Sequence, residues 1–313
     1  MTGELYTNPI EMVEVSPRDG LQNEKTQIGT SEKVGLIERA IEAGFRRIEV
    51  TSFVNPRAVP QMADAEDVCA NLPEREDVTY IGLVMNQRGA DRALATGRID
   101  QIGAVSVATD RFAMANQGQT SDGSVEAAKA IIETAKSAGK TGQATIAASF
   151  GCPFEGEVAE ERVIAMAASL AEAAPVEIAL ADTIGVGNPA HVASLVTRVK
   201  QAIGAIPVRV HFHNTRGTGL ANVWAAIGAG AVTVDASIGG LGGCPFAPGA
   251  AGNVATEDVV YMLERAGIET GIDLPSLIEA NHWLSAVMGK QLAAMVARSG
   301  GFPAPEKQEE EIA

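Results

Sequence analysis

Short apolar runs recur along the chain and are separated by longer segments in which apolar residues return at helical spacing. The first run, residues 10–15 (IEMVEV), is short and mostly apolar and ends at a polar turn, which is typical of a β-strand. The next segment has an N-cap candidate in Ser31 and ends at Gly44, which is typical of a helix. Continued along the chain, this pattern predicts strands at 10–15, 46–50, 78–84, 102–108, 142–148, 176–181, 208–214 and 232–236. It predicts helices between them at 31–44, 87–95, 124–138, 160–173, 189–203 and 220–228.

The strands alternate with helices, and no obvious linker separates them. This order predicts an α/β fold, namely a closed (β/α)8 TIM barrel. The barrel and the helices that follow it are expected to form one domain, residues 1–301. Extra C-terminal helices are expected at 256–265 and 275–288, and the acidic tail, 302–313, is expected to be disordered. An open doubly wound sheet is the alternative, but it requires a glycine-rich phosphate-binding turn after the first strand. Here a polar turn, SPRDG, stands in that place. A polar loop is expected from the fourth strand to Gln119.

Composition narrows the partners of the protein. The 24 basic and 39 acidic residues give a net charge of −15, which argues against nucleic acid or an anionic membrane as partner. A polyanionic ligand must therefore meet a local cluster of cations. No apolar run approaches the ~18 residues of a membrane span, and the N-terminus lacks the pattern of a signal peptide. Only three cysteines are present, which favours a reducing cytoplasm over a disulfide framework.

Two of the four histidines, His211 and His213, alternate with apolar residues in the seventh strand. Residues two apart on a strand point to the same side, so the two imidazoles form half of a candidate metal site. Asp19 and Asn253 follow the first and eighth strands, and the carboxyl ends of barrel strands share one rim. Two nitrogens and two oxygens suit octahedral Mg²⁺ or Mn²⁺ more than tetrahedral zinc.

Each of these residues also has a structural alternative. The histidines could be half-buried strand residues that hydrogen-bond to neighbours. Asp19 could form an Asx-turn before Gly20, and Asn253 could cap the helix that follows it. Other polar residues expected near the same rim, just after or near the ends of strands, are Arg18, Gln22, Glu49, Asp182 and Cys244.

Several motifs of the chain are found together in one enzyme family. They are residues 15–24 (VSPRDGLQNE), 49–54 (EVTSFV), 151–156 (GCPFEG), 182–187 (DTIGVG), 240–245 (GLGGCP) and 252–258 (GNVATED). With them the chain resembles the 3-hydroxy-3-methylglutaryl-CoA lyases, from about residue 11 to residue 289. These lyases belong to a larger family of metal-dependent barrel lyases and synthases that includes isopropylmalate synthase. The glycine-cysteine motif is the most specific part, because the synthases do not share it.

The resemblance implies a division of roles among these residues. It implies that Arg18 and Gln22 contact the substrate, with Arg18 facing the thioester oxygen. It implies that Cys244 protonates the enolate of acetyl-CoA, and that Glu49 supports Arg18 and the metal-bound water. The metal ligands that it implies are Asp19, His211, His213 and Asn253.

The activity implied is cleavage of 3-hydroxy-3-methylglutaryl-CoA to acetyl-CoA and acetoacetate by retro-Claisen chemistry. Such an enzyme takes part in leucine degradation or ketone-body formation. The partners expected are an acyl-CoA thioester and further copies of the chain, in a homodimer or a higher homo-oligomer. Cys69 and Cys152 are expected to be structural, on a helix face and in a strand-end turn.

The chain departs from the family pattern at several positions. Asn214 stands where those lyases carry an aspartate, Met85 where they carry a proline, and residues 145–148 (TIAA) where they carry a tyrosine and a serine-cysteine pair. Smaller residues on the fifth strand would enlarge the acyl pocket or make it less polar. The same chemistry on another branched 3-hydroxyacyl-CoA, citramalyl-like or with a longer chain, is therefore an alternative. Less favoured are a barrel without catalysis and a condensing synthase, whose regulatory domain is not expected after Gly301.

Overall fold

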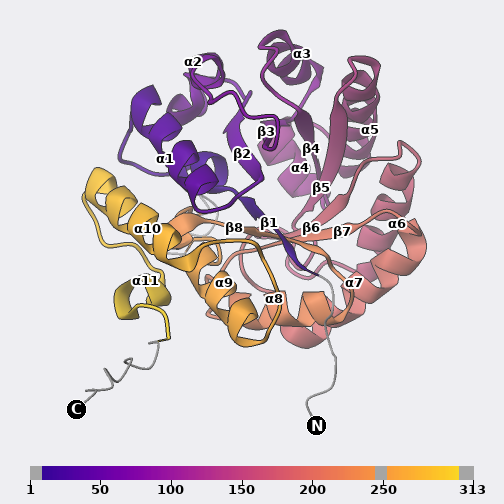
Figure 1. Cartoon of the computed structure of the whole chain (residues 1–313). Helices are drawn as coiled ribbons and strands as arrows, with labels where there is room; N and C mark the ends of the chain where they lie inside the picture. The colour runs from indigo at the N-terminus through magenta and orange to yellow at the C-terminus, as the bar shows by residue number, and fades with distance from the viewer. Residues whose placement is uncertain (1–8, 244–251, 303–313) are drawn as a thin grey trace, which may run out of the picture.

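The strands of the computed structural model are parallel, and each pairs with the strands before and after it in the chain (Figure 1). The first also pairs with the eighth, with Glu11 beside Thr233 and Glu14 beside Ala236, so the sheet closes into a barrel. The predicted TIM barrel is confirmed, and the open doubly wound sheet is excluded. The structure describes residues 9–243 and 252–302. Its strands are β1 (Glu11–Glu14), β2 (Arg47–Ser52), β3 (Thr79–Val84), β4 (Gln101–Val107), β5 (Thr141–Ala147), β6 (Ile178–Asp182), β7 (Val208–Phe212) and β8 (Thr233–Ala236).

Helices surround the barrel. Those between the strands are α1 (Thr30–Glu42), α2 (Ala65–Ala70), α3 (Gln87–Ala95), α4 (Asp110–Gln117), α5 (Ser121–Ser137), α6 (Glu160–Ala171), α7 (Pro189–Ile203) and α8 (Gly219–Gly228). After β8 come α9 (Thr256–Arg265), α10 (Leu274–Met288) and α11 (Met295–Ser299). Figure 1 shows α10 next to α1, where the Arg39 guanidinium lies 4.0 Å from the ring centre of Trp283. Over the described part of the chain, no helix combines the length and apolar composition that a bilayer-spanning helix needs.

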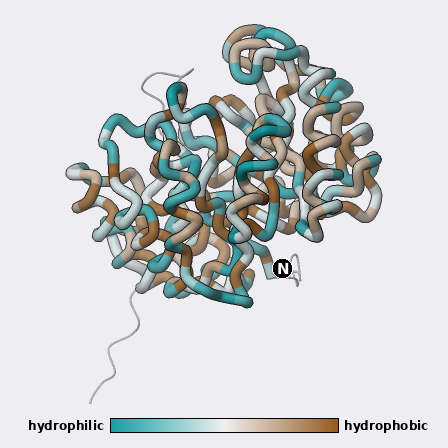
Figure 2. The backbone as a smooth tube through the Cα atoms, turned by 90° about the horizontal axis from the view of Figure 1, so that it is seen from above, coloured by the Kyte–Doolittle hydropathy of each residue, from teal (hydrophilic) through white to brown (hydrophobic). Residues whose placement is uncertain are grey.

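The outer helices bury one face against the barrel, and α7 shows how the sequence encodes this. Asn188 caps its first turn, with its side chain accepting the N–H groups of Ala190 and His191 at 3.1 Å each, and Pro189 opens the helix. Each buried valine or leucine stabilises the fold by about 1.5–3 kcal/mol. Figure 2 shows hydrophobic and hydrophilic positions alternating around the turns of such helices. The buried face of α7 consists of Val192, Leu195, Val196, Val199 and Ile203.

Two predictions of local structure are wrong. The expected polar loop before Gln119 is mostly helix α4 (Asp110–Gln117), in which only Phe112 and Ala113 are buried. Two apolar positions are too few to reveal a helical period in the sequence. The expected turn at Ser16–Gly20 is a single π-helical turn, a rare conformation that is frequent at functional sites. The short helices α2 and α11 were not predicted either, whereas the expected acidic tail lies almost entirely outside the described residues.

Charged side chains alternate inside the barrel. Arg209 of β7 is 1% exposed, and its guanidinium donates to Asp235 of β8 and, at 3.1 Å each, to Gln143 and Glu177. Glu177 also accepts hydrogen bonds from Arg47 of β2. We refer to Arg47, Glu177, Arg209 and Asp235 as the buried charge column. An unpaired charge at such a depth would be strongly destabilising, so the alternation of cations and carboxylates is what makes the column tolerable.

Two fully buried carboxyl groups hold the short 3₁₀ turn Ile238–Gly240 that follows β8. Glu14 of β1 accepts the N–H of Ile238 at 3.0 Å, and Glu257 of α9 accepts the N–H of Gly239 at 2.9 and 3.0 Å. Burial raises the pKa of Glu14 to about 7 and the pKa of Glu257 to about 8. Both groups therefore take up protons on folding at pH values where an unfolded glutamate is ionised.

Stability is consequently expected to fall as the pH rises. A glutamate in the unfolded chain has an ordinary pKa of 4.5, whereas Glu257 has a pKa of about 8 in the fold. This carboxyl group binds more protons in the folded chain between these values, so its contribution to the free energy of unfolding is largest below the lower value and is lost progressively up to the upper one. Glu257→Gln, which mimics the protonated carboxyl, should flatten this dependence in urea unfolding followed by circular dichroism. The exposed Glu133→Gln is the control, and a slope in Glu257→Gln as steep as that of the wild type would contradict the prediction.

Candidate functional site

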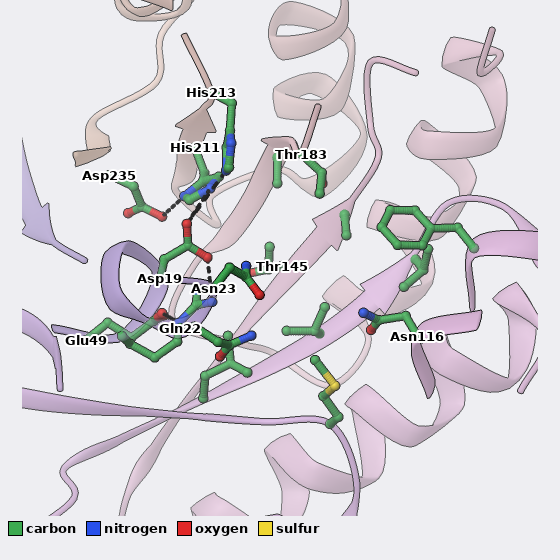
Figure 3. Close-up of a pocket in the computed structure, with 18 of the residues that line it drawn as sticks. Asp19, Gln22, Asn23, Glu49, Asn116, Thr145, Thr183, His211, His213 and Asp235 are labelled. Atoms are coloured by element: carbon green, nitrogen blue, oxygen red, sulfur yellow. Dashed lines mark hydrogen bonds and ion pairs between the residues drawn. The ribbon is translucent and has the colours of Figure 1, made fainter. Parts of the chain in front are cut away.

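Three side chains with metal-binding atoms meet at the carboxyl end of the barrel (Figure 3). Asp19 belongs to the π-helical turn after β1, His211 lies on β7, and His213 follows that strand. The Nε2 atoms of His211 and His213 lie 3.8 and 3.6 Å from Oδ2 of Asp19. The centres of the two imidazole rings are 5.2 Å apart. The structure therefore confirms that both rings face the same side, and it brings the predicted aspartate to them.

The spacing of these atoms fits a small divalent cation. Ligand atoms lie about 2.1 Å from Mg²⁺, so neighbouring ligands of an octahedral ion are about 3 Å apart. The candidate ligand atoms of the three residues all lie within 4.8 Å of one another, at distances from Asp19 that are too long for hydrogen bonds. A small contraction around an ion would bring all three into ligand distance. The donor set, one carboxylate and two imidazoles, is one that Mg²⁺ or Mn²⁺ can share with substrate oxygens.

Asn253 also reaches this cluster. A backbone bridge pairs it with His213, and its Nδ2 donates to Oδ2 of Asp19 at 2.8 Å and to the carbonyl of Leu241 at 3.0 Å. To act as a ligand it would have to turn its amide oxygen toward the ion, so this role stays a prediction. Gly242 packs against the same amide with a left-handed φ of 115°, and a Cβ there would lie 2.7 Å from Nδ2 of Asn253. Only glycine fits this position.

The turn and cap alternatives for Asp19 and Asn253 do not describe the structure. The carboxylate of Asp19 accepts hydrogen bonds from Nη1 of Arg18 at 2.6 Å and from Asn253. The N-cap position of α9 is held by Ala255, two residues beyond Asn253. Both side chains therefore point to the rim of the barrel, as the metal-site prediction requires.

Arg18 is held between two carboxylates. Its Nε donates to Glu49 of β2, its Nη1 donates to Asp19, and all three side chains are largely buried. Burial by itself raises the pKa of Asp19, but the charge of Arg18 and the neighbouring imidazoles of His213 and His211 together outweigh burial and hold that pKa well below its usual value. Asp19 therefore stays ionised, as a metal ligand must be. The predicted support of Arg18 by Glu49 is present in the structure.

Asp235 is the main site residue that sequence reasoning missed. It lies on β8 beside His211, and its Oδ2 is 3.1 Å from Nδ1 of that histidine. Burial alone would raise the pKa of Asp235, but the charge of Arg209 and the contact with His211 lower it. Nδ1 of His213, by contrast, has no hydrogen-bond partner among the described residues. The signal in the sequence was a single polar residue between Val234 and Ala236, in a strand that neighbours the two histidines.

A cavity of about 150 Å³ opens beside the cluster. Arg18, Asp19 and the histidines line one end, and Figure 3 shows Asn116 of α4 at the other. Gln22 lies in this lining, as predicted, and accepts a hydrogen bond from Ser52 at 3.0 Å. Cys244 lies outside the described residues. The wall between the two ends is mostly apolar and comprises Leu83, Met85, Val105, Val107, Phe112, Thr145, Ala147, Ala181 and Thr183.

Three other polar or cysteine residues named from the sequence do not line the pocket: Asp182, Cys69 and Cys152. The fully buried carboxylate of Asp182 accepts the N–H groups of Val186 and Gly187 at 3.0 and 2.8 Å, so it holds the loop after β6 and does not line the pocket. Cys69 is buried in α2 and Cys152 is buried in a turn after β5, as expected.

The family model HMGL-like matches residues 9–284 of the chain. The chain is 42% identical over 307 residues to an (R)-citramalyl-CoA lyase of Chloroflexus aurantiacus, covering 93% of this chain and 95% of that protein. It is 40% identical over 287 residues to the hydroxymethylglutaryl-CoA lyase YngG of Bacillus subtilis, covering 92% of this chain and 96% of that protein.

Solved structures of HMG-CoA lyases also match the chain. A crystal structure of the HMG-CoA lyase of Bacillus subtilis superposes with a TM-score of 0.91 at 39% identity, over 94% of this chain and 98% of that one. The structure of an HMG-CoA lyase from Acinetobacter baumannii, in complex with coenzyme A and 3-methylmalate, gives a TM-score of 0.90 at 40% identity. That match covers 97% of this chain and all 100% of the other.

Replacing His211 with alanine is expected to remove most Mn²⁺ binding while the barrel still folds, because His211 lies at the rim and supplies one of three closely spaced ligand atoms. Equilibrium dialysis against Mn²⁺ measures the affinity, and circular dichroism checks the fold. His282→Ala on α10 is the matched control, since that imidazole contacts the carbonyl of Ala297 away from the site. Unchanged affinity in His211→Ala would show that the metal is bound elsewhere.

Proposed function

The chain belongs to the HMGL-like family of carbon–carbon lyases, and we propose that it cleaves 3-hydroxy-3-methylglutaryl-CoA to acetyl-CoA and acetoacetate with a divalent cation. The observation that carries this proposal is the position of Arg18, Asp19, His211 and His213 together at one end of a single pocket. The set offers ligands for an ion and a fixed cation for an enolate oxygen, which are the two needs of this reaction.

The reaction breaks the bond between C2 and C3 of the acyl group. The C3 hydroxyl loses its proton and becomes the carbonyl of acetoacetate, while the electron pair of the broken bond moves into the thioester as an enolate. A proton delivered to C2 then completes acetyl-CoA. When bound, Mg²⁺ or Mn²⁺ would polarise the hydroxyl and carboxylate oxygens of the substrate, and Asp19, His211 and His213 would hold it, with Asn253 as the proposed fourth ligand.

Arg18 is placed to stabilise the enolate oxygen. Its Nε and Nη1 groups are occupied by Glu49 and Asp19, whereas its Nη2 has no hydrogen-bond partner among the described residues. Arg18 belongs to the lining of the pocket. A guanidinium held in this way is already oriented before negative charge develops on the substrate, so little reorganisation is needed during the reaction. Glu49 acts by holding that orientation.

We propose Cys244 as the acid that protonates C2, a role that rests on the resemblance of the motif around it. The chain enters that segment at the pocket, because Gly243 belongs to the lining and its carbonyl accepts a hydrogen bond from Asn23 at 3.1 Å. A thiol with an ordinary pKa near 8.5 can deliver a proton at neutral pH far more readily than a hydroxyl.

Citramalyl-CoA is a second candidate substrate, with the same tertiary hydroxyl and the same product acetyl-CoA. Three of the departures from the family pattern, Met85, Thr145 and Ala147, line the pocket between the metal cluster and α4. Thr145 and Ala147 make the part of the wall on β5 smaller and less polar than in the family pattern, which suits a different acyl branch, including longer ones. Asn214, the remaining departure named above, does not line the pocket. Its side chain accepts the N–H of Gly219 at 3.0 Å.

The proposal also covers the partner, the metabolic setting, the oligomeric state and the location of the protein. An acyl-CoA thioester is the proposed partner, and leucine breakdown is the proposed metabolic setting. We further propose a homodimer or higher homo-oligomer in the cytoplasm, with Mg²⁺ or Mn²⁺ as cofactor.

Acetyl-CoA release from a panel of thioesters tests the proposed function. We expect release from 3-hydroxy-3-methylglutaryl-CoA with Mg²⁺ or Mn²⁺, slower release from citramalyl-CoA, and none from either after chelation with EDTA. A kcat/KM on citramalyl-CoA that exceeds the other value would make the second candidate the substrate. Absence of release from every thioester in the panel would refute the lyase assignment, and full release in EDTA would refute the role of the metal.

Arg18→Lys is expected to lower kcat by about 10²–10³, because a lysine cannot contact Glu49, Asp19 and the substrate oxygen at once. Steady-state kinetics on the best substrate measures the loss. Arg39→Lys on α1, where the guanidinium packs on Trp283, is the matched control and should keep the wild-type kcat. A wild-type kcat in Arg18→Lys would remove this residue from the mechanism.

A further inference from the structure

Asp235 lies between two hydrogen-bond donors deep inside the barrel. One carboxylate oxygen, Oδ1, accepts from Nε of Arg209, and the other, Oδ2, lies 3.1 Å from Nδ1 of His211. Asp235, Arg209 and His211 are 5%, 1% and 7% exposed, so these contacts are largely shielded from solvent. The opposite ring nitrogen of His211, Nε2, points toward Asp19.

We propose that Asp235 is a positioning residue that fixes which nitrogen of His211 carries the proton. By accepting Nδ1–H it leaves Nε2 unprotonated, with its lone pair directed at the place where Asp19 and His213 converge. A neutral imidazole can bind a metal only through its unprotonated nitrogen, so this choice of tautomer decides whether His211 is a ligand. The inference rests on the proposed metal site and names the group that prepares it.

The geometry explains why a carboxylate is needed at this position. A guanidinium has N–H donors and no acceptor, so the oxygen that faces Arg209 must accept. A carboxylate can meet this demand with one oxygen and still accept from His211 with the other. An amide has only one oxygen, so in Asp235→Asn the oxygen would turn to Arg209 and the NH₂ group to His211. The histidine would then have to accept at Nδ1 and carry its proton on Nε2, where the metal should bind.

The other contacts of Arg209 keep its guanidinium facing Asp235. Its Nη1 also donates to Glu177 and to Gln143, at 3.1 Å each, and Glu177 is held in turn by Arg47. The buried charge column thus anchors the guanidinium on both sides. The other carboxylate of the column offers a matched control, because Glu177 contacts the same arginine and has no hydrogen bond or ion pair to His211.

His213 provides a comparison within the same site. Its Nδ1 has no hydrogen-bond partner among the described residues, so no neighbouring carboxylate selects its tautomer. Of the two histidines in the described part of the site, His211 alone has a carboxylate at Nδ1, which is why the proposal concerns that residue.

The first test reads the tautomer in the wild type itself and uses variants only to assign the signals. Long-range ¹H–¹⁵N NMR of the metal-free wild type, at an alkaline pH where imidazoles are neutral, reports the tautomer of each ring. With four histidines in the chain, single substitutions can assign every signal. We expect His211 to carry its proton on Nδ1. A proton on Nε2 would overturn the proposal.

The second test compares Asp235→Asn with Glu177→Gln, each a carboxylate-to-amide change on a partner of Arg209. We expect Asp235→Asn to weaken Mn²⁺ binding, measured by electron paramagnetic resonance, by about 10–100-fold and to move the His211 proton to Nε2. Glu177→Gln should change the Mn²⁺ affinity by less than about 3-fold and leave the tautomer as it is. An Asp235→Asn protein with wild-type affinity, or an equal loss in both variants, would overturn the proposal.

The two tests also separate this inference from the proposed function. If the wild type binds no Mn²⁺, the metal-dependent function fails, whereas the NMR experiment on the metal-free protein still decides the role of Asp235. If Asp235→Asn does not fold, as circular dichroism would show, the tautomer in the wild type remains the deciding measurement.

Discussion

The pairing of β1 with β8 is the interaction on which the rest of the structure depends. Asp19 follows the first strand and His211 lies on the seventh, so the chain carries them far apart before the sheet closes. Closure of a parallel sheet puts the carboxyl ends of all strands on one rim, and the two residues meet there. Glu14 reinforces the junction, since this residue of β1 accepts the N–H of Ile238 just after β8.

The interior of this barrel is unusual in energetic terms. Buried ion pairs seldom stabilise a fold more than well-packed apolar side chains of similar volume, because each charge loses its hydration. The buried charge column therefore contributes orientation more than stability: it begins at Arg47 and ends at Asp235, directly beside His211. Breaking it at Asp235 would remove from Arg209 the carboxylate that also contacts His211, which links the geometry of the rim to a charge deep in the barrel.

Most of the fold and the centre of the site could be predicted from the sequence. Alternating apolar runs identified every strand, and the rule that barrel sites lie at strand ends brought Asp19 and Asn253 to the histidines. What escaped prediction lacked a local signal. Asp235 is one polar residue in an otherwise ordinary strand, and its importance comes from the register that sets it beside His211. Helix α4 has only two buried residues, so its helical character depends on tertiary contacts.

The described groups that we propose to bind or orient the reacting atoms of the substrate lie on or just after β1, β2, β7 and β8, whereas Met85, Thr145 and Ala147 follow or belong to β3 and β5. In the proposed function, the reaction chemistry and the preference for an acyl group therefore depend on different strands of one barrel. A substitution on β5 would then change which thioesters the pocket accepts while the reacting groups on the other strands stay in place. A barrel divided in this way could acquire a new substrate by reshaping one wall of its pocket.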